Sequence, residues 1–178
     1  VAGPRRTGGL PAAARRGHLA LLDTLDALIA DPPLLKAAGE EPRKPIAKAV
    51  RKDFRKVSRL IAQASDLEPG TDRDVALHEA RKKAKRTRYA AEAAEPVLGE
   101  PAKTMVKSMK ALQNRLGEHQ DSVMARQALR ELSAVAHAAG ESAFTYGLLH
   151  EREEQRAVRV EAELPGFWDG IKGGAAAL

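Results

Sequence analysis

A histidine and a dense run of basic side chains between residues 77 and 92, LHEARKKAKRTRYAAE, are the part of this sequence best suited to chemistry. At about 100° per residue, a helix over this run buries Leu77, Ala80 and Ala84 on one face. The opposite arc carries the histidine, five cations and a tyrosine: His78, Arg81, Lys82, Lys85, Arg86, Arg88 and Tyr89. Ammonium and guanidinium groups bind phosphate oxygens through charge-assisted hydrogen bonds, so this arc predicts an anion site.

Two neighbouring segments carry basic stripes of the same kind. Around residues 45–65, apolar positions recur every three or four residues, and another face holds Lys48, Arg51 and Arg55. The segment after Pro101 aligns Lys103, Lys107, Lys110 and Asn114. Like charges four residues apart destabilise a helix by a few tenths of a kcal/mol per pair. We therefore expect neighbouring helices to turn these cations toward a shared trough, where a polyanion balances them.

Helices must position these side chains. Alanine, leucine, lysine, arginine and glutamate dominate, and no stretch alternates apolar and polar residues as a half-buried strand would. Proline and glycine divide the chain into five expected amphipathic helices, at about 11–30, 45–65, 72–95, 101–138 and 142–163.

The ends of these helices follow from local signals. Thr71 or Asp72 is the expected N-cap of the third helix, residues 96–99 its end, and Pro165 the end of the last. Gly117 is either a kink in the fourth helix or is carried at a cost of about 1 kcal/mol. Short loops predict an all-α, up-and-down bundle. We expect one helical domain over residues 10–168, with frayed termini at 1–9 and 169–178.

Composition limits the functions of the chain. Its 178 residues contain no cysteine, which excludes disulfides, thiolate metal sites and cysteine nucleophiles. The net charge is +6, but residues 43–115 hold 19 basic and nine acidic residues, whereas residues 118–178 hold six and ten. The positive field is therefore concentrated in one region. No apolar run reaches the length of a membrane-spanning helix, no signal peptide is recognisable, and we expect a cytoplasmic protein.

The scarcity of aromatic rings bears on which polyanion is bound. Aromatic residues make up 3% of the chain, and proteins that read single-stranded nucleic acids usually stack bases on aromatic side chains. A surface that contacts phosphates alone favours inorganic polyphosphate. Nonspecific nucleic-acid binding and a basic scaffold for an acidic protein stay open as alternatives.

Catalysis and metal binding are not expected. The cations around His78 would repel a metal ion. His119 and Asp121 lie two residues apart, so their side chains diverge on a helix, and we expect Asp121 to pair with a basic residue and orient the basic surface. The sequence holds no P-loop and no serine, histidine and acid spacing typical of a hydrolase. We therefore predict a non-enzymatic binding protein with no cofactor and no metal.

Two segments also carry a family resemblance. The first is the basic run from Leu77 to Glu92, and the second is LQNRLGEHQD, residues 112–121, in which a leucine-glycine pair precedes Asp121. They resemble two landmarks of the CHAD family, the conserved-histidine alpha-helical domain, the first being the second copy of its basic signature. The resemblance covers about residues 18–165, and no segment before residue 43 contains the first copy of the signature.

The resemblance implies two similar helical bundles with basic residues along a central groove. This chain would hold the second bundle and part of the preceding region, and therefore half of that groove. The resemblance also implies a function, because members of this family bind polyphosphate and accompany polyphosphate granules. Many of them are fused to a CYTH triphosphatase domain. Residue by residue, the basic signature is matched here by His78, Arg81, Lys82, Lys85, Arg86 and Arg88, and the family's acid by Asp121.

Overall fold

The computed structural model describes residues 12–39 and 41–175, and it divides the chain into two compact units. The first unit, residues 1–41, contains helix α1 (Ala12–Ala30) and a short 3-10 helix, η1 (Lys36–Gly39). The second unit begins at residue 42 and contains four helices: α2 (Arg43–Asp66), α3 (Thr71–Leu98), α4 (Glu100–Ala138) and α5 (Phe144–Ala175). The described residues contain no strand, and the predicted all-α class is confirmed.

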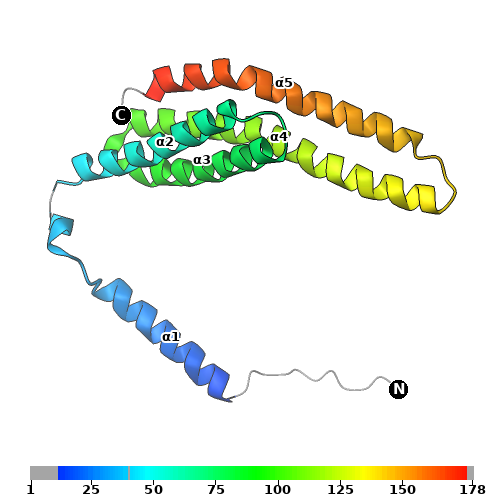
Figure 1. The fold of residues 1–178 in the computed structure, drawn as a ribbon. Helices are drawn as coiled ribbons and strands as arrows, with labels where there is room; N and C mark the ends of the chain where they lie inside the picture. The colour runs from blue at the N-terminus through cyan, green and yellow to red at the C-terminus, as the bar shows by residue number, and fades with distance from the viewer. Residues whose placement is uncertain (1–11, 40, 176–178) are drawn as a thin grey trace, which may run out of the picture. The chain divides into compact units, whose positions relative to one another are not determined.

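The four helices of the second unit run alternately up and down (Figure 1). Helix α3 packs against α2 and α4, and α4 packs against α5. Apolar residues spaced three and four apart on each helix form the shared core, as the periodicity predicted. Its most enclosed members include Val57, Ile61, Ala84, Met109 and Leu112. The expected up-and-down bundle is therefore present in this unit.

Helix α3 begins and ends differently from the expectation. Its N-cap residue is Gly70, and no side chain caps it, so neither Thr71 nor Asp72 has that role. At the other end, Pro96 lies inside the helix and only Gly99 terminates it. Gly99 has φ 65°, a left-handed conformation that favours glycine, and its N–H donates to the carbonyl of Glu95.

Helix α5 does not end at Pro165, where the sequence predicted its end, but continues to Ala175. The reason is packing: Trp168 and Ile171 are buried in the core, and the Trp168 ring stacks on Phe54 of α2 with centroids 5.4 Å apart. Residues 169–175, which we expected to fray, are therefore helical. The expected frayed segment at residues 1–9 lies outside the described residues.

The end of α4 and the start of α5 extend beyond α2 and α3 as a two-helix hairpin (Figure 1). Gly140, at φ 75°, lies in the connection between them. Because no third helix of this unit covers the hairpin, Leu132, Val135 and Leu148 are exposed, and Phe144 is 72% exposed. Among the described helices, none has a stretch long and apolar enough to span a bilayer.

Candidate anion-binding surface

Arg81 reaches from α3 onto α4 and marks the seam between these helices. A Cβ atom added to Gly117 of α4 would lie 3.6 Å from Nε and 3.7 Å from Nη2 of Arg81. Both are ordinary contact distances, so the guanidinium lies against Gly117 at the seam, and α4 runs through this glycine as one continuous helix. Nε of Arg81 is buried and has no hydrogen-bond partner among the described residues.

The basic stripes of α3 and α4 border this seam from its two sides. His78 and Lys85 lie within about 60° of Arg81 around α3, and Lys110 and Asn114 lie within about 60° of Gly117 around α4. Two of the three expected stripes therefore share one surface. We call it the α3–α4 strip, and it consists of His78, Arg81, Lys82, Lys85, Lys103, Lys107, Lys110 and Asn114; all but the half-buried His78 and Arg81 are exposed.

Some of the predicted binding cations have a carboxylate partner on their own helix. These pairs are Lys82 with Glu79, Arg88 with Glu92 (3.0 Å) and Lys103 with Glu100 (2.6 Å). Exposed pairs one helical turn apart contribute little to stability, so such cations can exchange a carboxylate for a phosphate. Lys85, Arg86, Lys107 and Lys110 take part in none of the ion pairs between described residues.

The third stripe, on α2, does not join this surface. Asp53 marks the side of α2 that faces α3, because its carboxylate lies 2.8 Å from the ammonium of Lys83. Lys48, Arg51 and Arg55 lie between about 140° and 160° around the helix from Asp53, and all three are exposed. The expectation that all three stripes converge in one trough was therefore wrong, because packing on α3 turns the α2 cations away.

Tyr89 is exposed, and its ring contacts two cations of α3. The guanidinium carbon of Arg88 lies 4.7 Å from the Tyr89 ring centroid, and Nζ of Lys85 lies 5.9 Å from it. Both distances fit a cation–π interaction. The aromatic residue of the signature therefore holds two basic side chains in position.

His78 lies at one end of the α3–α4 strip, beside a groove of about 330 Å³. Its Nδ1 is buried and has no hydrogen-bond partner among the described residues. The groove continues the seam along the second half of α4, and its polar lining is Thr71, Asp74, His78, Gln120, Gln127 and Arg130. Asp121, by contrast, is exposed and joins none of the ion pairs between described residues, so its expected pairing with a cation is not seen.

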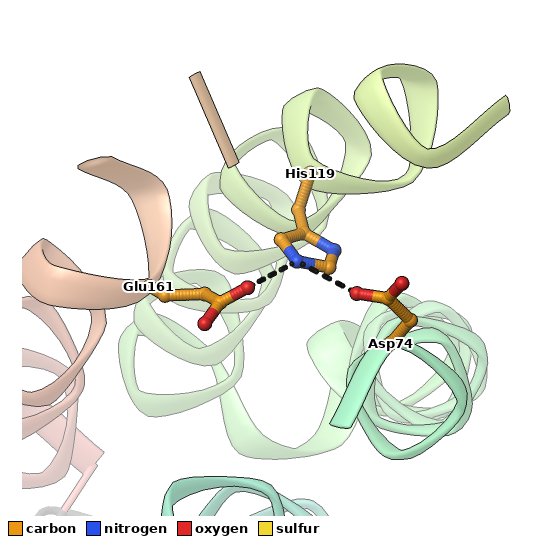
Figure 2. Close-up of side chains that lie close together, drawn as sticks. All are labelled: Asp74, His119 and Glu161. Carbon is orange, nitrogen blue, oxygen red and sulfur yellow. Dashed lines mark hydrogen bonds and ion pairs between the residues drawn. The ribbon is translucent and has the colours of Figure 1, made fainter. Parts of the chain in front are cut away.

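A partly buried ion-pair hub, centred on the buried His119, joins α3, α4 and α5 (Figure 2). Nε2 of His119, on α4, lies 2.9 Å from Oε1 of Glu161 on α5 and 3.4 Å from Oδ1 of Asp74 on α3. The outer oxygens of the two carboxylates contact Arg73 (2.8 Å) and Arg126 (3.5 Å). Because an ionised carboxylate only accepts hydrogen bonds, the hydrogen atom lies on Nε2 of His119, whose N–H donates a hydrogen bond to Oε1 of Glu161.

The two carboxylates of the hub differ in their electrostatics. The hydrogen bond from His119, together with the contact with Arg73, holds the pKa of Glu161 below its usual value despite burial. Burial instead raises the pKa of Asp74, and the attraction of His119 and Arg126 offsets this only in part. The surroundings therefore favour the ionised form of Glu161, whereas they disfavour the ionised form of Asp74.

The hub has ligand atoms that a metal ion could use. One atom each of Asp74, His119 and Glu161 lies within 4.8 Å of the others, a donor set that zinc accepts. However, an arginine already neutralises each carboxylate, so a divalent cation would add uncompensated charge. We interpret the group as a structural hub that fixes the rotation of α3 and α4.

Sequence reasoning did not find this hub, although a signal was present. Met109, Leu112 and Leu116 mark the core stripe of α4, and His119 is the next position in that series. A histidine at a core position needs buried polar partners. The sequence could thus have indicated that His119 is buried, but not that its partners are Asp74 and Glu161.

Comparison with known families identifies the family of this chain. The model of the CHAD domain matches residues 9–130. The chain belongs to the CHAD domain family. This family is associated with polyphosphate binding, and the match includes all of α2 and α3 and most of α4, which carry the α3–α4 strip.

Two proteins of Mycobacterium tuberculosis are similar to this CHAD chain. They are the uncharacterized proteins MT2285, from strain CDC 1551, and Rv2226, from strain H37Rv; each is 37% identical over 147 residues, which is 83% of this chain. The aligned part is 27% of each relative, so the chain spans about a quarter of their length. No solved structure matches the chain.

Proposed function

We propose that this CHAD chain binds inorganic polyphosphate along the α3–α4 strip and does so without catalysing a reaction. The observation that carries the proposal is the position of Arg81 over Gly117, because it brings two basic stripes to one seam. An extended polyanion lying along the seam would meet cations from both helices. Lys85 and Tyr89 on α3 and Lys107 and Lys110 on α4 would hold successive phosphates.

The residues around the seam favour a ligand without bases. Tyr89 is the aromatic residue of the basic signature, and its ring already packs under Arg88. A single exposed ring offers little of the base stacking on which single-strand binders rely. We therefore propose polyphosphate rather than RNA, with the protein at cytoplasmic polyphosphate granules.

The test is a binding titration with polyphosphates of graded length at several salt concentrations. Binding to a polyanion releases counterions, so log K should fall linearly with log salt. Reversing two cations, Lys85→Glu with Lys110→Glu, should weaken binding and reduce the slope by roughly 1.4 to 1.8. The matched control is Arg152→Glu with Arg159→Glu, which changes the net charge equally on exposed positions of α5.

Three outcomes would contradict the proposal. Equal weakening by the control pair would mean that net charge, and not the α3–α4 strip, governs affinity. Competition by RNA of equal charge at the same concentration as polyphosphate would favour a nonspecific nucleic-acid module. Orthophosphate release that depends on added metal would make the protein a hydrolase.

A further inference from the structure

Helix α2 carries a second basic surface that the α3–α4 strip does not use. Its members are Lys44, Lys48, Arg51 and Arg55, all exposed, and we call them the outer α2 face. They fall within about 60° of one another around the helix and extend over about 16 Å along it. None of them takes part in an ion pair between described residues.

The outer α2 face lacks local acids that could neutralise it. Between residues 43 and 65 the sequence contains one acidic residue, Asp53. Its carboxylate faces the other way, where it contacts Lys83 of α3 at 2.8 Å and Lys56 at 3.6 Å. These contacts hold the pKa of Asp53 below its usual value, and the hydrogen bond from Lys83 is the main cause. The carboxylate of Asp53 therefore belongs to the α2–α3 contact and does not neutralise the outer α2 face.

Geometry separates the two basic surfaces. Lys83 and Asp53 define the line from α2 to α3, and the outer α2 face lies between about 140° and 180° around the helix from Asp53. The α3–α4 strip lies on the other side of that contact, over the seam that Arg81 marks. The two surfaces therefore face different directions, on either side of the α2–α3 contact.

We infer that the outer α2 face is a second, independent polyphosphate-binding surface, so that one CHAD chain bridges two polyphosphate segments. The inference rests on the proposed function, because it assigns the same ligand to both surfaces. Bridging has a physical consequence: a protein with two sites and a ligand with many sites form a network near equal site concentrations. Excess polyphosphate should dissolve the network, because each surface then holds a separate chain.

Two double variants separate the surfaces. Lys48→Glu with Arg55→Glu reverses the outer α2 face, and Lys85→Glu with Lys110→Glu reverses the α3–α4 strip, with the same change in net charge. The new glutamates on α2 lie three or four residues from Lys44 and Arg51, which favours the helix. Arg152→Glu with Arg159→Glu is the charge control, and circular dichroism checks that each variant is folded.

The readouts are the stoichiometry with a short polyphosphate and the light scattering with a long one. We expect the unchanged protein and the charge control to bind two short chains and to scatter light at intermediate ratios of long polyphosphate. Each surface variant should bind one short chain and should not scatter.

The outcomes distinguish this inference from the proposed function. If the α2 variant keeps both its stoichiometry and its scattering, the second surface is refuted, while the α3–α4 strip stands. If the α3–α4 variant binds like the unchanged protein, or no protein binds, the proposed function itself fails. If the charge control loses scattering as the α2 variant does, net charge explains the effect and the inference is overturned.

Discussion

Replacing Glu161 by glutamine is expected to destabilise the four-helix unit strongly, because Glu161 links α5 to both other helices of the hub. Its two carboxylate oxygens accept from His119 at 2.9 Å and from Arg73 at 2.8 Å. Glutamine offers one acceptor oxygen and one NH₂ group. Whichever way the amide turns, its NH₂ faces a donor, and Arg73 loses its anionic partner.

The magnitude follows from burial. The side chains of Arg73 and Glu161 are 20% and 15% exposed, and breaking such a pair from one side costs about 3 kcal/mol, the lower end for buried pairs. Arg73 keeps its hydrogen bond to the carbonyl of Leu67, which limits the loss. For a unit of this size, about 3 kcal/mol corresponds to a fall in Tm of roughly 10 °C.

The matched control lies two residues further along α5. Glu163 contacts Arg115 at 2.7 Å, but its side chain is 56% exposed. Glu163→Gln should therefore cost about 0.5 kcal/mol or less. The measurement is urea unfolding followed by far-UV circular dichroism for both variants. Equal destabilisation of the two would refute the idea that burial of the hub, rather than the presence of an ion pair, stabilises the bundle.

Three further predictions concern the same helices. Because the hub lowers the pKa of Glu161, its ionised side chain stabilises the fold above the ordinary pKa of 4.5, and this stability is lost as the pH falls below that value. The free energy of unfolding, measured from about pH 6 downward, where carboxylates titrate, should therefore fall less steeply in Glu161→Gln than in the unchanged protein. The same pH dependence in both proteins would contradict this. Gly117→Ala should stabilise α4 by up to about 1 kcal/mol, because the added methyl would sit at ordinary contact distance from Arg81; a lower Tm would show that the guanidinium needs more room. Zinc should leave the Tm unchanged, because arginines already neutralise both hub carboxylates; a saturable rise in Tm that disappears in His119→Asn would instead reveal a metal site.

Much of this protein could be predicted from its sequence because the signals are local. Helix-forming residues and apolar spacing of three and four identified α2, α3 and α4 to within a few residues, and the same spacing placed most of the predicted cations on exposed arcs. The family could also be recognised, because the signature between Leu77 and Glu92 is one continuous helical segment. Interactions within one or two turns of a helix do not depend on the rest of the chain.

Tertiary structure decided how these helices are rotated and which of their faces meet. Packing of Asp53 against Lys83 turns the α2 cations away from α3, and Arg81 over Gly117 brings the α3 and α4 stripes together. Burial of Trp168 carries α5 past Pro165. The hub joins Asp74 and Glu161, which are far apart in sequence, through His119. A periodic pattern fixes which side of a helix is apolar, whereas the partner of each remaining side depends on packing among all the helices at once.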